Sequence, residues 1–195
     1  EVGLFQSPLW GRHNLLNVLG AIGAAHHLGV GWEDLRIGLA HFEGVKKRQE
    51  VRGEVRGVII LDDFAHHPSA VRETIAAVRL RFPGRRLWAV FEPRTNTSRR
   101  KIFQEAYAHS FDQADQIIVA DVNHPQKVPI QERFSSEQLV CDLRIRGKEA
   151  HHISGAQGIV DHLAGALNRH GQPKLAAPKH ENRFLESPDI FTVKD

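Results

Sequence analysis

The stretch "GVIILDDFAHHPSAV" (57–71) decides the fold of this chain. It begins with a continuous apolar run at 58–61, the pattern of a strand whose two faces are both buried in a sheet. Pro68 then suits the first turn of a helix, and apolar residues recur at helical spacing through 69–82. The stretch therefore predicts a buried strand that leads directly into a helix.

The same alternation of strand and helix continues along the chain. Further strands are expected at 86–92, 116–122 and 150–154, and further helices at 99–113 and 156–169. Ser135 and Gln138 form a capping-box pattern that predicts one more helix start. Strands separated by helices of this length imply right-handed crossovers and a parallel sheet. We therefore predict an α/β, Rossmann-like doubly wound fold with a mostly parallel sheet.

Both ends of the chain differ from this pattern. Two helices are expected before the first strand, at 13–28 and 32–42, and the first has an apolar stripe that we predict to be buried: Leu15, Val18, Leu19, Ile22 and Ala25. Gly171 suits the C-cap of the last helix. The polar segment 172–195 has little periodicity, so we expect it to be disordered or divergent. Because the chain contains no methionine, we also expect it to be a piece of a longer protein.

Composition narrows the possible partners. The net charge of +3 and thirteen histidines give a mild basic bias that suits an anionic partner. The arginines at 79, 81, 85 and 86 have no interleaved aromatic platform, which indicates a solvated helix end and no nucleic-acid partner. Cys141 is the only cysteine and fits a reducing compartment. Since no apolar run reaches membrane-span length, we expect a cytoplasmic protein without a membrane partner.

Polar residues gather where the first buried strand ends, at Asp62, Asp63, His66 and His67. Their types suit a metal, but adjacent histidine side chains diverge and no third pair repeats the pattern, so no metal site is predicted. An ordinary turn would explain Asp63 and Pro68 alone. Because ligands of parallel sheets bind at the carboxyl ends of strands, we interpret this segment as a ligand contact.

Two other stretches allow both a functional and a structural explanation. Segment 91–101, "FEPRTNTSRRK", joins a strand end to a helix start, where backbone N–H groups and guanidinium groups suit carboxylates or phosphates. A solvated basic face with Ser98 as N-cap explains it equally well. Asn14 and Asn17 share one helix face, and paired amides can read a purine edge, although surface asparagines are common. The sequence contains no G-x-x-x-x-G-K-[ST] loop and no G-x-G-x-x-G motif.

Taken together, these stretches resemble the Mur ligase family. "GRHNLLNVLGAIGAA" (11–25) is similar to the end of that family's central ATPase domain, and "GVKKRQEVRGEVRGVIILDDFAHHPSAV" (44–71) is similar to the start of its C-terminal domain. The resemblance implies a remnant of the central domain at 1–43 and the C-terminal domain at 44–171. The family ends with a further strand and a glycine-rich segment, which 172–195 does not resemble.

The resemblance also implies an activity. "VFEPRTNTSRRKIFQ" (90–104) is most similar to the family member that joins the tripeptide L-alanyl-γ-D-glutamyl-meso-diaminopimelate to UDP-N-acetylmuramic acid in peptidoglycan recycling. ATP phosphorylates a carboxylate, and the amine then attacks the acyl phosphate. The alternatives are the member that adds alanine, or a non-catalytic α/β module that binds a nucleotide or peptide.

Residue roles follow from the same resemblance. It implies ATP contacts at Asn14, Asn17, Arg48 and Asp63, with the two asparagines facing adenine. It implies a substrate cleft and a peptide-binding loop at His66, His67, Arg94, Asn96 and Arg99. No catalytic residue is assigned. The family's phosphate-binding loop and Mg²⁺ ligands precede this region, so we expect no ligase activity from this chain alone.

Overall fold

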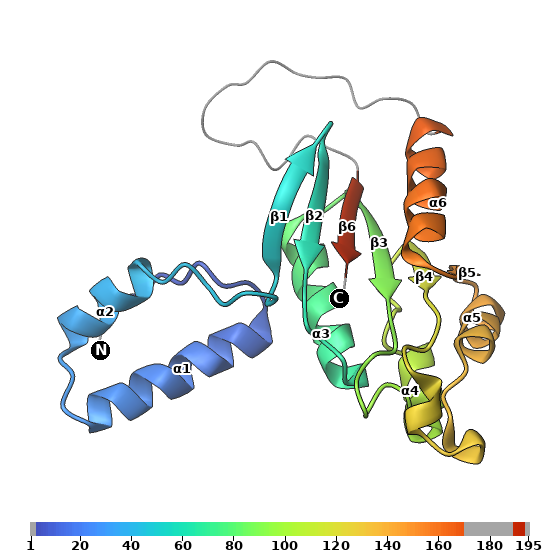
Figure 1. Ribbon diagram of the computed structural model, residues 1–195. Coiled ribbons are helices and arrows are strands. Elements are labelled where there is room, and N and C mark those ends of the chain that lie inside the picture. Colours follow the sequence, from blue (N-terminus) through green and yellow to red (C-terminus); the bar gives the residue numbers. More distant parts are fainter. Residues whose placement is uncertain (1–2, 170–188, 194–195) are drawn as a thin grey trace.

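The protein, seen here in a computed structural model, is described at residues 3–169 and 189–193 (Figure 1). Two helices come first, α1 (Arg12–His27) and α2 (Trp32–Ala40). A six-stranded sheet follows, formed by β1 (Glu50–Val55), β2 (Val58–Asp62), β3 (Arg86–Phe91), β4 (Gln116–Val119), β5 (Glu149–His152) and β6 (Asp189–Val193). Its helices are α3 (Pro68–Arg81), α4 (Gln104–Ala108), α5 (Ser136–Ile145) and α6 (Ala156–Arg169).

The sheet is parallel except at one edge. Its strand order is β1-β2-β6-β3-β4-β5, and β1 pairs with β2 in the antiparallel direction. Arg56 and Gly57 join β1 to β2 with φ angles of 51° and 78°. Positive φ at both central residues gives the hairpin a turn whose twist matches that of the strands. The remaining neighbours are parallel, which confirms the predicted fold class.

Each face of the sheet buries its own apolar core. In β3, Leu87 and Phe91 pack in the cluster that includes α3, α4 and α5, whereas Trp88 and Val90 pack in a second cluster with Ala166 of α6. This alternation is the period-2 pattern of a strand with helices on both sides. The predicted cap of α5 is also confirmed, because the Ser135 side chain accepts a hydrogen bond from the Gln138 N–H at 3.1 Å.

Strand β6 corrects the expectation for the end of the chain. Residues 189–193 lie between β2 and β3 in the sheet, and their backbone pairs with both neighbours. Segment 172–195 is therefore not disordered throughout. The strand was missed although residues 190–193 are of strand-favouring types, because the polar composition of the whole segment 172–195 outweighed this short run. Residues 170–188 and 194–195, including Gly171, lie outside the described residues.

The helix expected at 99–113 is shorter than predicted. A 3₁₀ turn, Lys101–Phe103, leads into α4, which ends at Ala108. The backbone of Arg100 forms an isolated bridge with Arg133, so the chain is still extended where the helix was expected to begin. At the other end, the Ser110 hydroxyl donates to the Ala106 carbonyl at 2.8 Å. Such side-chain bonds to the backbone compete with helical hydrogen bonding.

Two burial predictions are wrong in part. Leu15 and Leu19 of the α1 stripe are each 56% exposed, and Val18 is the buried residue of this helix. Arg85 does not belong to a solvated helix end, because it is only 3% exposed. Its guanidinium lies over the Phe82 ring and donates to the Gly57 carbonyl at 2.6 Å. Arg85 thereby provides a hydrogen-bond donor for a carbonyl group in the turn between β1 and β2.

The start of α1 is attached to the sheet domain through α3. A Cβ built on Gly11 would lie 2.4 Å from the Cβ of Ala77, so any side chain at position 11 would force the two segments apart. Gly11 also has a φ of 87°, which glycine adopts at little cost. Next to this contact, the Trp10 ring meets Phe82 edge-on with a centroid distance of 5.4 Å. In Figure 1, α1 and α2 extend away from the sheet beyond this attachment.

We predict that the backbone amides of β6 exchange their hydrogens more slowly than those of α1. The amides of 190–192 should exchange about as slowly as those of β3, because β6 is paired on both sides. Amides of α1 should exchange faster, since most of its side chains are exposed. Mass spectrometry after proteolysis, or NMR, measures both in one sample. Rapid exchange in β6, or strong protection throughout 13–28, would contradict the prediction.

Candidate functional site

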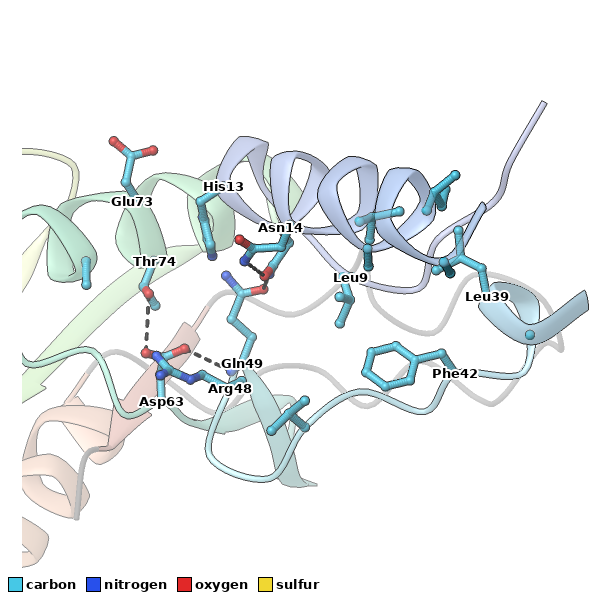
Figure 2. A pocket seen from close by; sticks show the side chains of 18 of the residues that line it. Leu9, His13, Asn14, Leu39, Phe42, Arg48, Gln49, Asp63, Glu73 and Thr74 are labelled. Atoms are coloured by element: carbon cyan, nitrogen blue, oxygen red, sulfur yellow. Dashed lines mark hydrogen bonds between the residues drawn. The ribbon is translucent and has the colours of Figure 1, made fainter. Parts of the chain in front are cut away.

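A pocket of about 840 Å³ lies where α1, α2, the turn at 45–49, the end of β2 and α3 meet. Most of its wall is apolar, with side chains that include Val18, Ile22, Leu39, Phe42 and Val45. Polar groups converge at one end, where Figure 2 shows Asn14, Gln49, Asp63 and Thr74. A concave, mainly apolar site of this size with a few convergent polar groups is typical of small-molecule binding.

The polar end is organised by the carboxylate of Asp63, which is 4% exposed. Asp63 accepts hydrogen bonds from the backbone N–H of Gln49 at 2.9 Å and of Ala65 at 2.7 Å. It also accepts one from the Thr74 hydroxyl at 3.3 Å. Three donors from separate segments compensate the burial of this group. Asp63 therefore holds the turn before β1, the end of β2 and helix α3 together.

The turn at 45–49, which precedes β1, has an unusual backbone. Lys47 and Gln49 have φ angles of 57° and 51°, which non-glycine residues seldom adopt. The Lys47 carbonyl accepts from the Phe64 N–H at 2.7 Å, and its N–H donates to the Glu50 carboxylate at 2.8 Å. This backbone hydrogen bond, assisted by Arg52, lowers the pKa of Glu50 below its ordinary value. These contacts fix how Arg48 and Gln49 are presented to the pocket.

A chain of side-chain amides crosses the pocket from α1 to this turn. Asn14 Nδ2 donates to the Trp10 carbonyl at 2.8 Å and to Gln49 Oε1 at 3.2 Å. Asn17 Nδ2 lies 3.5 Å from Asn14 Oδ1, at the limit of a hydrogen bond. Figure 2 marks the contact between Asn14 and Gln49 with a dashed line. The two asparagines do share one face, as expected, and that face lines the pocket.

The four residues expected to contact ATP all line this one pocket: Asn14, Asn17, Arg48 and Asp63. Arg48 is exposed, and its guanidinium lies 5.8 Å from the centre of the Phe64 ring. The structure therefore brings together side chains from α1, the turn and β2. Their contact with a nucleotide stays a prediction.

The two histidines at 66 and 67 are not among the residues that line the pocket. His67 caps α3, because its Nδ1 accepts from the Ser69 N–H at 3.4 Å, and its ring packs edge-on against Phe103. The carbonyl of His66 accepts a hydrogen bond from the Tyr107 hydroxyl, whose pKa is raised by burial. Both residues thus hold the β2–α3 connection, and their substrate contact remains a prediction.

The loop expected to bind the substrate lies at the end of β3. Thr95 and Ser98 form a local turn in which the Thr95 N–H donates to the Ser98 hydroxyl at 2.9 Å. Arg99 donates from Nε to the Asn123 carbonyl at 2.6 Å, so part of its guanidinium is already used. Arg94 and Asn96 are exposed, and Arg94 lies 3.7 Å from the Glu92 carboxylate. None of these residues lines the pocket.

Metal ligands are scarce in the part of the chain that the structure describes. It contains no group of three or more His, Cys, Asp or Glu side chains placed to hold a metal ion. The expectation that Mg²⁺ ligands lie elsewhere in a longer protein stays a prediction. In the same described ranges, no helix has the length and apolar character needed to span a membrane.

His13 and Gln49 are among the pocket residues that sequence reasoning missed. Nδ1 of His13 and Nε2 of Gln49 are buried and have no hydrogen-bond partner among the described residues. A glutamine between charged residues in "KKRQEV" gives no local signal of burial. Its burial follows from the positive φ of the turn and from the contact with α1, and neither can be read from sequence periodicity.

We predict that Asp63→Asn will destabilise the fold by about 3 kcal/mol. The carboxylate has two acceptor oxygens and a negative charge, whereas the amide has one acceptor oxygen and no charge. Thr74→Val, which removes only the longest of the three hydrogen bonds, should cost about 1 kcal/mol. Urea unfolding of both variants and the unaltered chain measures the difference. Equal stability of the two variants would show that Asp63 does not organise the turn.

Comparison with known proteins places this chain in a family. The family model described as Mur ligase, glutamate ligase domain, matches residues 47–173. The UDP-N-acetylmuramate–L-alanine ligase of Nostoc punctiforme is 39% identical over 193 residues, which cover 98% of this chain and 39% of that protein. The chain thus spans about two fifths of the length of this curated relative.

Solved structures show the same fold. The UDP-N-acetylmuramate–alanine ligase of Thermotoga maritima superposes with a TM-score of 0.69 at 19% identity, covering 97% of this chain and 36% of that one. The murein peptide ligase of Psychrobacter arcticus superposes with a TM-score of 0.60 at 27% identity, covering 97% and 35%. Because the family model covers more than half of its residues, this chain belongs to the Mur ligase family.

Proposed function

We propose that this chain is the C-terminal part of an ATP-dependent ligase that joins an amino acid or peptide to UDP-N-acetylmuramic acid through an acyl phosphate. One observation carries the proposal. Asn14, Asn17, Arg48 and Asp63, which the family resemblance assigns to ATP, line a single pocket although they come from distant parts of the sequence. A curated relative at 39% identity is named as a ligase of this type.

The pocket has the properties that an adenine base needs. Its apolar walls, with Val18 and Ile22 of α1 among them, can cover the faces of a flat ring. The amides of Asn14, Asn17 and Gln49 lie at its polar end, where they can reach the ring edge. Arg48 is the exposed cation of the lining and suits the phosphate side of a nucleotide.

The names of the curated relatives favour L-alanine as the amino substrate. Those of Desulfitobacterium hafniense and Nostoc punctiforme are both named as L-alanine ligases, at 35% and 39% identity. Alanine has a single carboxylate, so its recognition needs few cationic donors.

The tripeptide is the second candidate, because of the loop after β3. Arg94 is exposed there and Arg99 lies close by, and a γ-D-glutamyl-diaminopimelate peptide carries several carboxylates that such guanidinium groups could bind. The similarity to a murein peptide ligase, at 27% identity, supports the same candidate.

A non-catalytic module that binds a nucleotide remains the alternative for this chain on its own. No phosphate-binding loop motif occurs in its sequence, and electrostatic stabilisation of the transferred phosphoryl group is the main catalytic requirement of such reactions. We therefore expect the isolated chain to bind adenosine or ATP without forming product from UDP-N-acetylmuramic acid and an amino substrate. Product formation by the isolated chain would contradict this expectation.

We predict that filling the pocket will weaken nucleotide binding. Ala21 of α1 lines the pocket, whereas Ala24 on the same helix is exposed and is not part of the lining. Ala21→Trp should weaken the binding of adenosine and of ATP at least about tenfold, or 1.4 kcal/mol, and Ala24→Trp should leave it unchanged. NMR titration detects such binding even when it is weak. A wild-type chain that binds neither ligand would refute the nucleotide site.

We predict that Arg94 contacts the amino substrate in the longer enzyme. Arg94→Ala should raise the KM for that substrate by an amount equivalent to about 1.5–3 kcal/mol, the worth of a charge-assisted hydrogen bond. The KM for ATP should change little, because Arg94 does not line the nucleotide pocket. Arg36→Ala, which removes an exposed arginine paired with Glu33 on α2, is the control.

Steady-state kinetics with L-alanine and with the tripeptide, each varied in turn, also tells the two candidates apart. A larger effect on the tripeptide would favour the second candidate. If only the KM for ATP rises in Arg94→Ala, the loop belongs to the nucleotide side of the cleft.

A further inference from the structure

Gln49 is held in the pocket from both sides. Its backbone N–H donates to Asp63 at 2.9 Å, and its side-chain Oε1 accepts from Asn14 Nδ2 at 3.2 Å. The residue is only 9% exposed and has a φ of 51°. A glutamine kept buried in a backbone conformation that costs energy, and tied at both ends, has a nearly fixed side chain.

The orientation of its amide is determined by Asn14. Asn14 Nδ2 also donates to the Trp10 carbonyl at 2.8 Å, an acceptor that cannot exchange roles. The nitrogen of Asn14 must therefore face both Trp10 and Gln49, so the oxygen of Gln49 faces Asn14. Figure 2 shows the Gln49 oxygen on the dashed line to Asn14 and its nitrogen turned away from that contact.

This leaves a buried donor at the polar end of the pocket. Gln49 Nε2 has no hydrogen-bond partner among the described residues. A buried polar group without a partner destabilises a protein, and such groups in a native fold commonly mark a binding or catalytic role. Gln49 is one of the residues that line the cavity, so this unpaired amide nitrogen belongs to the wall that a bound ligand would contact.

We propose that Gln49 is a specificity-determining residue, whose Nε2 donates a hydrogen bond to a ring nitrogen of the adenine base. The inference rests on the proposed nucleotide site and adds to it a residue that family resemblance did not assign. The ring nitrogens N1, N3 and N7 of adenine are acceptors, and Nε2 is a donor in every state of the amide. Asn14 then acts as a positioning residue, because it sets the orientation of Gln49.

A merely structural role makes a different prediction. Gln49 also links α1 to the turn, and loss of this link would weaken every ligand of the pocket to the same extent. A direct hydrogen bond instead makes the protein sensitive to one atom of the base. Adenosine and its 1-deaza, 3-deaza and 7-deaza analogues differ only in whether a given ring nitrogen is present, so they separate the two roles.

The test is an NMR titration of the 195-residue chain with these four nucleosides. In the wild type, one deaza analogue should bind about five- to tenfold more weakly than adenosine, since it leaves Nε2 buried without a partner. The side-chain NH₂ signal of Gln49 should shift with adenosine and shift much less with that analogue. In Gln49→Met, which keeps a long unbranched side chain without the donor, all four nucleosides should bind alike.

Gln104→Met is the matched control. Gln104 on α4 makes two hydrogen bonds with the backbone of Ser135 and does not line this pocket, so this variant should keep the wild-type discrimination. If Gln49→Met does not fold, the wild-type signal of Gln49 still decides the outcome. The inference about Gln49 is overturned if the wild type binds all four nucleosides with equal affinity, or if the discrimination persists in Gln49→Met. Either result leaves the proposed nucleotide site intact. Absence of adenosine binding to the wild type overturns the nucleotide site as well.

Discussion

The candidate site depends on one buried carboxylate. Asp63 stands directly after β2 and accepts hydrogen bonds from the turn before β1, from the backbone N–H of Ala65, and from α3. The positive φ of Gln49 is tolerated because its N–H has this partner. Since the same turn presents Arg48 and Gln49, the polar end of the pocket depends on the hydrogen bonds that Asp63 accepts.

Helix α1, which forms the other wall of the pocket, is joined to the sheet domain by a close contact between Gly11 and helix α3. Gly11 packs against Ala77 of α3 where no side chain would fit, and α1 begins at the next residue. The amide of Asn14 then reaches Gln49 across the cavity. The pocket is therefore formed by two segments that meet at few points, and a ligand between them would add contacts to both. This arrangement suits a site in which binding and the position of α1 depend on each other.

Local signals in the sequence predicted the parallel strands β2, β3, β4 and β5, most helices and the cap of α5, because each depends on residues close together in the chain. They failed for features that depend on contacts between segments far apart in the sequence. Strand β6 needs β2 and β3 on either side, α4 is shortened by the bridge between Arg100 and Arg133, and Leu15 and Leu19 lack a covering surface in the described residues. Gln49 was missed for the same reason, since its burial depends on Asn14 and Asp63.

The missed strand also sets the spacing of the proposed site. The nucleotide pocket begins at the end of β2, and the loop with Arg94 begins at the end of β3. Because β6 lies between these strands, their ends are two strand spacings apart, roughly 10 Å. Direct pairing of β2 with β3 would halve this separation and leave little room between a nucleotide and an incoming amine. The short strand β6 thus determines how far apart the two proposed subsites lie.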